Sequence, residues 1–394
     1  MRAEINKLLS IRAIRSFMVV MPIITLYFQE SGLLIRDIFV LQVIFSIAIV
    51  ILEVPSGYFA DVFGRKGSLI LGVLVGTAGF FMYYLAFGFW GFAVAEILLA
   101  FSAAFLSGAD SAFLYDTLQQ YGAVDQHTRQ QGRIISATRV SEAVASLLGG
   151  FLATIIAFKS IFLVEFFVMA LAIPIAFSLK EPPIPPSTEK RKNILQILSF
   201  ALHENKKLLY LNIFSGVIST VTLVMVWFAQ PYWESLGVPL LYFGVMWAVL
   251  NMLVAVGAFF AHRLEKFFSF RTLFGFVALL PIILYGLLSL GVPYIALVVI
   301  PLFWMLRGVY QPISLDYINR ETDSSTRATV VSISQLFGRA TFSILSPFLG
   351  WIADVWSFET AFAASAVVFG VLSITSFLFL YSKIKNQPKM YGIN

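Results

Sequence analysis

The sequence predicts an all-α membrane protein, with twelve transmembrane helices arranged as two pseudo-symmetric six-helix bundles. Of its 394 residues, 59% are hydrophobic and only 12% are charged, and the mean hydropathy is +0.87. Apolar runs of about 20 residues, the length that crosses the hydrocarbon core of a bilayer, recur along the whole chain. Backbone polar groups inside lipid must be satisfied within the segment, so we expect each run to be a helix.

A proline-rich, charged stretch divides the predicted spans into six and six. The spans lie at about 11–29, 38–60, 68–88, 91–116, 133–158, 161–179, 208–232, 240–262, 271–289, 293–315, 329–354 and 358–382. The stretch between the sixth and seventh spans contains four prolines and a run of charges, which is typical of a stiff, solvated linker. The prediction is therefore an N-terminal bundle over 1–179, a linker over 180–207 and a C-terminal bundle over 208–394.

The two halves repeat one another at an offset of 200 residues. The matched pairs are Asp116 with Asp316, Arg139 with Arg339, Ser146 with Ser346, Gly150 with Gly350, and Ala153 with Ala353. Together these matches favour a duplicated six-helix unit.

The distribution of lysine and arginine predicts the orientation of the chain in the membrane. If the N-terminus is inside, nearly all of these residues fall in the inner connections, and the outer connections carry only Arg36 and Lys159. By the positive-inside rule, both termini are cytoplasmic in a cell (inner) membrane protein. The net charge of +6 is thus a sign of topology and not of nucleic-acid binding.

A charged, glycine-rich turn joins the second and third spans. It contains Gly57, Asp61, Gly64, Arg65 and Lys66 in the order G-x-x-x-D-x-x-G-R-K, and Asp61 lies four residues before Arg65, within reach across one helical turn. The stretch resembles the signature loop of the major facilitator superfamily of secondary transporters. The resemblance implies two bundles with a substrate site between them near the bilayer midplane. It also implies a cytoplasmic gate, in which Arg65 reaches Asp116 at the end of the fourth span.

Ionisable side chains inside spans are costly and are functional candidates by default. Asp110 in the fourth span and Arg139 and Glu142 in the fifth lie at similar depth, and the last two are three residues apart on one helix face. Two readings remain open for these three residues. They form a cavity-wall network in which one carboxylate carries the coupling proton, or they form a closed ion-pair cluster.

In the second half the deep charges are Arg307 and Arg339, with no comparably deep carboxylate. These arginines either reach across to the acids of the first half or bind an anionic group of the substrate. A third alternative for Arg307 is that it snorkels toward the membrane surface or contacts a backbone carbonyl. In the superfamily, spans 1, 4, 7 and 10 line the cavity. That resemblance implies the lining residues Arg15, Met18, Met21, Asp110, Trp227, Gln230, Arg307 and Gln311, although Met18 and Trp227 are equally consistent with plain helix packing.

The sequence therefore predicts a secondary active transporter and not an enzyme. We expect it to work as a monomer, to be proton-coupled and to export a small organic solute by an antiport mechanism. Proton-driven uptake of an anionic metabolite or metal chelate, or a non-transporting sensor of the same fold, are the alternatives. No cofactor, metal site or nucleic-acid partner is expected: there is no cysteine, no phosphate-binding loop, and the histidines His127, His203 and His262 lie in or near the connections.

Overall fold

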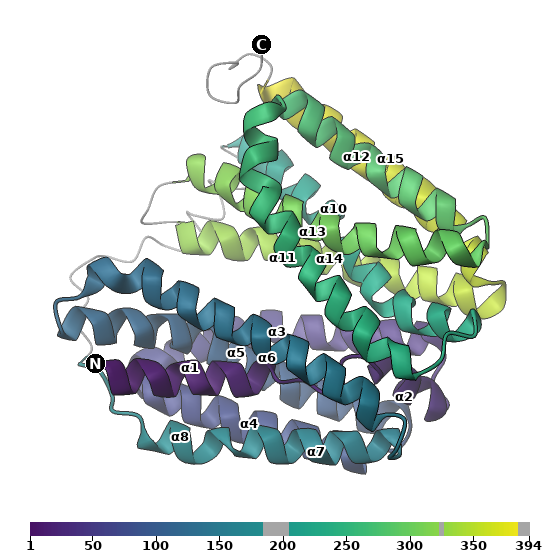
Figure 1. Cartoon of the computed structure of the whole chain (residues 1–394). Coiled ribbons are helices and arrows are strands. Elements are labelled where there is room, and N and C mark those ends of the chain that lie inside the picture. Colours follow the sequence, from purple (N-terminus) through teal and green to yellow (C-terminus); the bar gives the residue numbers. More distant parts are fainter. Residues whose placement is uncertain (184–204, 323–326, 385–394) are drawn as a thin grey trace. The chain divides into compact units, whose positions relative to one another are not determined.

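The computed structural model describes residues 1–183, 205–322 and 327–384, and every regular element in that part of the chain is a helix (Figure 1). Most of the predicted linker, 180–207, and residues 385–394 lie outside the described residues. The chain divides into two compact units. The all-α prediction is confirmed, and the domain boundaries at 179 and 208 stay predictions.

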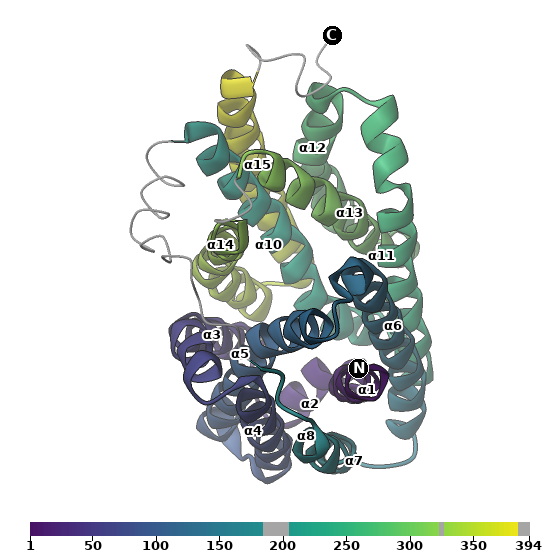
Figure 2. The same ribbon diagram turned by 90° about the vertical axis from the view of Figure 1, so that its left-hand side faces the viewer.

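The first unit comprises 1–33, the described part of 41–188, and 237–248. Its helices are α1 (Arg2–Ser16), α2 (Ile24–Glu30), α4 (Arg65–Leu85), α5 (Gly88–Gln120), the 3₁₀ turn η1 (Val124–Gln126), α6 (His127–Leu152), α7 (Phe158–Ala170) and α8 (Ala172–Ser178). Helix α4 packs against α5 and α7, and α1 packs against α6 and α8. Figure 2 views α1 nearly end-on, with α6 beside it. This α1–α6 pair carries the charged groups considered below.

The second unit comprises 34–40, the described part of 189–236, and the described part of 249–394. Its helices are α10 (Lys206–Ser235), α12 (Phe270–Leu288), α13 (Pro293–Arg320), α14 (Arg327–Val355) and α15 (Phe358–Ile384). Helix α10 packs against α13, α14 and α15, and α12 lies alongside α15 (Figure 1). An aromatic cluster that includes Phe214, Phe274, Tyr310 and Tyr317 lies in the core of this unit.

Two long helices, α3 (Ile35–Val62) and α11 (Leu241–Phe267), contribute residues to both units. Glycine allows close backbone approach in these helices. Within the first unit, a Cβ atom added at Gly150 of α6 would lie only 2.6 Å from the Cα of Gly244 in α11. Within the second unit, a Cβ added at Gly257 of α11 would lie 3.0 Å from the amide nitrogen of Val309 in α13.

Ten helical segments are long and apolar enough to cross a membrane, among the described residues. They agree with ten of the predicted spans to within a few residues, which supports an integral membrane protein. The two remaining predicted spans do not appear among these ten segments. The span at 11–29 is divided into α1 and α2, and the span at 133–158 is α6, which ends at Leu152. Helix α6 carries several charged residues along its length, so the twelve-helix count stays a prediction.

Candidate functional site

The first predicted span is interrupted at its centre. Helix α1 ends at Ser16 and α2 begins at Ile24, so residues 17–23 are not helical. The backbone amide of Val19 donates a hydrogen bond of 2.8 Å to Oε2 of Glu165 on α7. The Glu165 side chain is almost fully buried, at 1% exposure. An amide that the break removes from the helix thus finds its acceptor on another helix, as a membrane interior requires.

Two more contacts hold this break in place. A Cβ added at Gly149 of α6 would lie 2.9 Å from the carbonyl carbon of Val19, so only glycine fits there without a shift. The hydroxyl of Tyr27 on α2 donates 3.1 Å to the carbonyl of Tyr83 on α4. Interrupted helices with free backbone groups are where many transporters place substrate and ion sites. Sequence reasoning missed the break, although Pro22, which lacks an amide hydrogen, was an available signal.

The three ionisable residues predicted to act together, Asp110, Arg139 and Glu142, fall into two ion pairs. Asp110 on α5, 2% exposed, pairs through Oδ2 with Nε of Arg12 on α1 at 2.7 Å. Arg139 and Glu142 pair with each other at 2.8 Å, as their spacing predicted. The ion-pair partner of the buried Asp110 carboxylate is thus Arg12 on α1 and not Arg139, and the role of Asp110, Arg139 and Glu142 in transport stays a prediction. Sequence reasoning had counted Arg12 only as a topological charge.

A pocket of about 390 Å³ opens between α1 and α6 in the first unit. It is lined by Arg12, Arg15, Ser16, Gln131, Ile135, Thr138, Arg139 and Glu142. Arg12 and Arg139 have carboxylate partners, whereas Arg15 makes no hydrogen bond or ion pair with any residue that the structure describes. Arg15 is attracted to Asp110 only over a longer range, so the N–H donors of its guanidinium remain available to a carboxylate, a phosphate or another hydrogen-bond acceptor.

The turn between α3 and α4 has the Asp61–Arg65 contact that its spacing predicts and the Arg65–Asp116 contact that the resemblance implies. Nη1 of Arg65 lies 2.6 Å from Oδ1 of Asp61, and its Nε lies 3.4 Å from Oδ2 of Asp116 at the end of α5. Gly64 has a φ of +91°, a conformation that favours glycine. The role of this cluster as a gate stays a prediction, and so do the roles of Gly57 and Lys66.

Glu181, just after α8, completes this turn and was not singled out in the sequence. Its carboxylate oxygens accept the backbone amides of Arg65 at 2.6 Å and Lys66 at 2.8 Å, the first turn of α4. A carboxylate at a helix N-terminus satisfies free amides and favours the positive end of the helix dipole. A Cβ at Gly64 would lie 2.8 Å from this carboxylate, which is a second reason for glycine at that position.

The candidates of the second unit lie on three helices. Trp227 and Gln230 are on α10, Arg307 and Gln311 on α13, and Arg339 on α14. Gln230 is completely buried and Gln311 is exposed, while Trp227 and the two arginines are half-buried. Both arginines take part in interactions within the structure. Their predicted role in lining a substrate cavity stays a prediction.

The second unit also has a charge cluster near the end of α11. Arg320 on α13 pairs with Glu265 on α11 at 2.7 Å and with Asp316 one turn away on its own helix. Asp316 matches Asp116 by the 200-residue offset, so both halves pair this acid with an arginine. No group of three or more histidine, cysteine or acidic residues suited to a metal ion occurs in the parts of the chain that the structure covers.

A sequence model described as Major Facilitator Superfamily matches residues 8–340. Solved structures with the same fold include the nucleoside transporter NupG, with a TM-score of 0.75 and 16% identity over 98% of this chain and 100% of that chain. A D-xylose–proton symporter has a TM-score of 0.76 and 11% identity over 96% of both chains. A bacterial homologue of the human lysosomal transporter Spinster, inward-facing and occupied, has a TM-score of 0.72 and 16% identity over 99% of this chain and 97% of that one. A comparison with curated protein sequences finds no match.

Proposed function

Because this chain belongs to the major facilitator superfamily, we propose that it is a proton-coupled secondary transporter that exports a small organic solute by alternating access. Family membership and fold make it a transporter and not an enzyme. The coupling ion, the direction and the chemistry of the solute are the proposed parts. We also propose that the membrane is the cell (inner) membrane and that both termini are cytoplasmic.

The observation that carries the proposal is the pocket between α1 and α6. Its mixture of arginines with hydroxyl, amide and apolar side chains suits an organic molecule with at least one strong acceptor group better than a bare ion. The structural neighbours are named as a nucleoside transporter and a D-xylose–proton symporter. Both names refer to small organic solutes, and one refers to proton coupling.

Arg15 favours a second candidate, which is proton-driven uptake of an anionic metabolite or metal chelate. In the part of the chain that the structure describes, its guanidinium has no ion-pair partner at bonding distance and only a longer-range attraction to Asp110, so it is placed to bind a substrate carboxylate or phosphate. In the second unit, Arg307 and Arg339 are proposed as substrate-binding residues, together with Trp227, Gln230 and Gln311.

The coupling site is proposed among the acids of the first unit. Asp110 is paired with Arg12 and Glu142 with Arg139, and exchange of these partners during transport would change how readily each acid binds a proton. The cluster of Asp61, Arg65 and Asp116, with Gly57, Gly64 and Lys66 of the same turn, is proposed as the cytoplasmic gate.

A thermal-shift screen of anionic, cationic and neutral organic solutes tests the substrate proposal. We expect an anionic or acceptor-rich solute to raise the unfolding temperature of the native protein and to lose that effect in Arg15→Gln. Lys266→Gln is the matched control, because this exposed lysine makes no side-chain hydrogen bond or ion pair with described residues. A solute whose effect survives Arg15→Gln unchanged would contradict the assignment of this pocket.

A further inference from the structure

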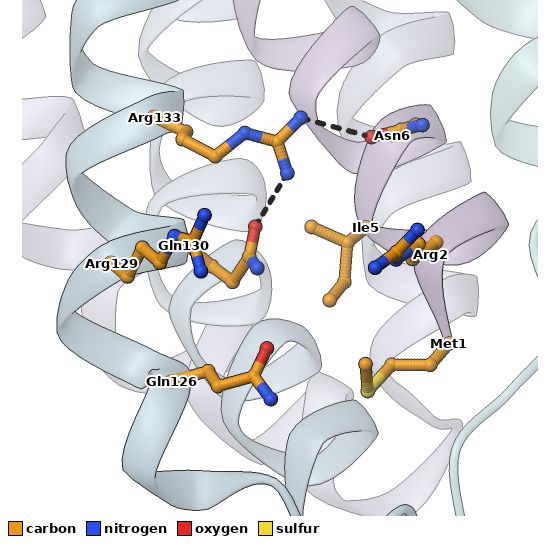
Figure 3. A pocket seen from close by; sticks show the side chains of 8 residues that line it. All are labelled: Met1, Arg2, Ile5, Asn6, Gln126, Arg129, Gln130 and Arg133. Carbon is orange, nitrogen blue, oxygen red and sulfur yellow. Dashed lines mark hydrogen bonds between the residues drawn. The ribbon is translucent and has the colours of Figure 1, made fainter.

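A second pocket lies between α1 and the η1–α6 segment, nearer to the N-terminal end of α1. Its volume is about 250 Å³, and it lies wholly within the first unit. Figure 3 shows Arg129 and Arg133 on one wall, from α6, and Arg2 on the facing wall, from α1. None of its lining residues is shared with the pocket around Arg15.

The lining of this pocket is cationic and contains no acidic side chain. The acid of the same helix, Glu4, is already occupied. Its carboxylate accepts a hydrogen bond from Nζ of Lys7 at 3.0 Å and another from the backbone amide of Lys180 at 2.8 Å. Burial acts to raise the pKa of Glu4, but these hydrogen bonds and the two nearby lysines outweigh it and lower the pKa. The Glu4 carboxylate therefore interacts with Lys7 and Lys180 and does not neutralise the arginines of the pocket.

One of the three arginines is held across the pocket by amide oxygens. Nη1 of Arg133 donates 2.7 Å to Oε1 of Gln130, and its Nη2 lies 3.5 Å from Oδ1 of Asn6 on the opposite helix (Figure 3). Arg2 and Arg129 make no hydrogen bond or ion pair with described residues. The pocket thus holds many more hydrogen-bond donors than acceptors, which is the reverse of what a closed structural cluster shows.

We propose that this pocket binds a phosphate-bearing anion, whose oxygens are taken by Arg2, Arg129 and Arg133. Guanidinium groups suit phosphate because each presents two parallel N–H donors to two oxygens. The predicted topology places this end of α1 at the cytoplasmic surface, where basic pockets between helices bind lipid headgroups. The same chemistry would accept a soluble phosphate, so the headgroup of an anionic lipid and a soluble phosphate are two sources of one ligand group. The inference does not rest on the proposed transport activity.

The test uses the full-length protein in a neutral detergent, with unfolding temperature as the readout. Inorganic phosphate is titrated at constant ionic strength, and phosphatidylglycerol is titrated separately in mixed micelles, with phosphatidylcholine as the neutral comparison. We expect at least one of the two anionic probes to stabilise the native protein and phosphatidylcholine to have no such effect.

The double variant Arg2→Gln/Arg129→Gln removes two donors that have no partner among the described residues, so no described contact is lost. Because hydrogen bonds to a charged group are among the stronger ones in proteins, we expect the affinity of the probe that stabilises the protein to fall by about tenfold or more. Arg129→Lys keeps the positive charge but loses the pair of parallel N–H donors. Its affinity for the probe should lie between those of the native protein and the double variant.

Lys206→Gln/Lys266→Gln is the matched control, because it removes the same charge from two exposed lysines of the second unit. Stabilisation by phosphate assigns the site to a soluble anion, and stabilisation by phosphatidylglycerol alone assigns it to a lipid headgroup. The proposal is overturned if neither probe stabilises the protein, or if the matched control loses as much affinity as the arginine variant.

Discussion

Asp110, a buried acid on α5, forms its ion pair with Arg12 of α1, whose Nε lies 2.7 Å from its Oδ2. Asp110 is 2% exposed, so it depends on its cation far more than an acid at the surface would. Both residues were visible in the sequence, but Arg12 is one of many basic residues at inner helix ends. Only the packing of α1 against α5 shows which arginine reaches the acid.

Replacing Arg12 by glutamine should destabilise the protein by about 3 kcal/mol, because it removes the ion-pair partner of a buried carboxylate. Asp110 then keeps only the Ser111 hydroxyl, which donates 3.1 Å to its Oδ1, and the longer-range attraction of Arg15. The comparison is Arg139→Gln, which breaks a pair whose arginine is 57% exposed and should cost less than about 1 kcal/mol. Denaturant unfolding in detergent measures both. Adding Asp110→Asn to Arg12→Gln should recover part of the loss, and a double variant no more stable than Arg12→Gln would speak against the pair.

At the scale of elements, ten predicted spans agree with the structure because hydropathy over a helix length is a local property. The break at residues 17–23 depends instead on a contact between residues far apart in the sequence. Its amide acceptor, Glu165, lies 146 residues away from Val19, so apolar composition alone predicts a continuous helix there. Pro22 was the single local signal. Helix α6 was predicted as an apolar span, and in the structure its polar and charged side chains line both pockets.

Gly149→Ala tests whether the break is built by close packing. The added methyl would press on the backbone of Val19, and overpacking of this kind typically costs about 1–3 kcal/mol. Gly132 on the same helix has no atom within 4 Å of its would-be Cβ. Gly132→Ala should therefore be neutral or stabilise by up to about 1 kcal/mol, since alanine is the better helix former. Equal losses in the two variants, measured by thermal unfolding, would refute this account of the break.

The end of α14 carries a second structural device of the same kind as Glu181. Asp354 accepts the backbone amides of Ile35 at 2.9 Å and Arg36 at 2.8 Å, the first turn of α3, within the second unit. The stretch 350–355 shares the pattern G-x-x-A-D-V with residues 57–62. Part of the charged, glycine-rich turn therefore recurs at the end of another helix.

Asp354→Ala should cost about 1 kcal/mol, the usual loss when a helix N-cap is removed. The comparison is Asp125→Ala. This exposed aspartate makes no side-chain hydrogen bond or ion pair with described residues, so its replacement should change stability little. Chemical denaturation gives both values. If Asp354→Ala matches the Asp125 variant, the two hydrogen bonds do not contribute measurably to stability.

At the scale of the whole molecule, the sequence was sufficient for the fold class and the family, because both depend on features repeated along the chain. The signature turn, the charge asymmetry and the apolar periodicity each draw on many residues. The candidate site was predicted less well. Arg15, Arg139 and Glu142 do lie together in one pocket, but Asp110 is bound to Arg12, and Glu165 and Glu181 were not assigned to the contacts they make. Such pairings depend on which helices meet, and one sequence does not reveal this.

The most direct test of the central claim is solute flux in proteoliposomes under an imposed pH gradient, using a solute that stabilises the native protein. The account predicts that the solute crosses against its own gradient, that collapsing the pH difference abolishes this accumulation, and that Arg15→Gln slows it while Lys266→Gln does not. A solute that binds in the Arg15 pocket yet never crosses the membrane, with or without the pH gradient, would contradict the account and favour a sensor with a transporter fold.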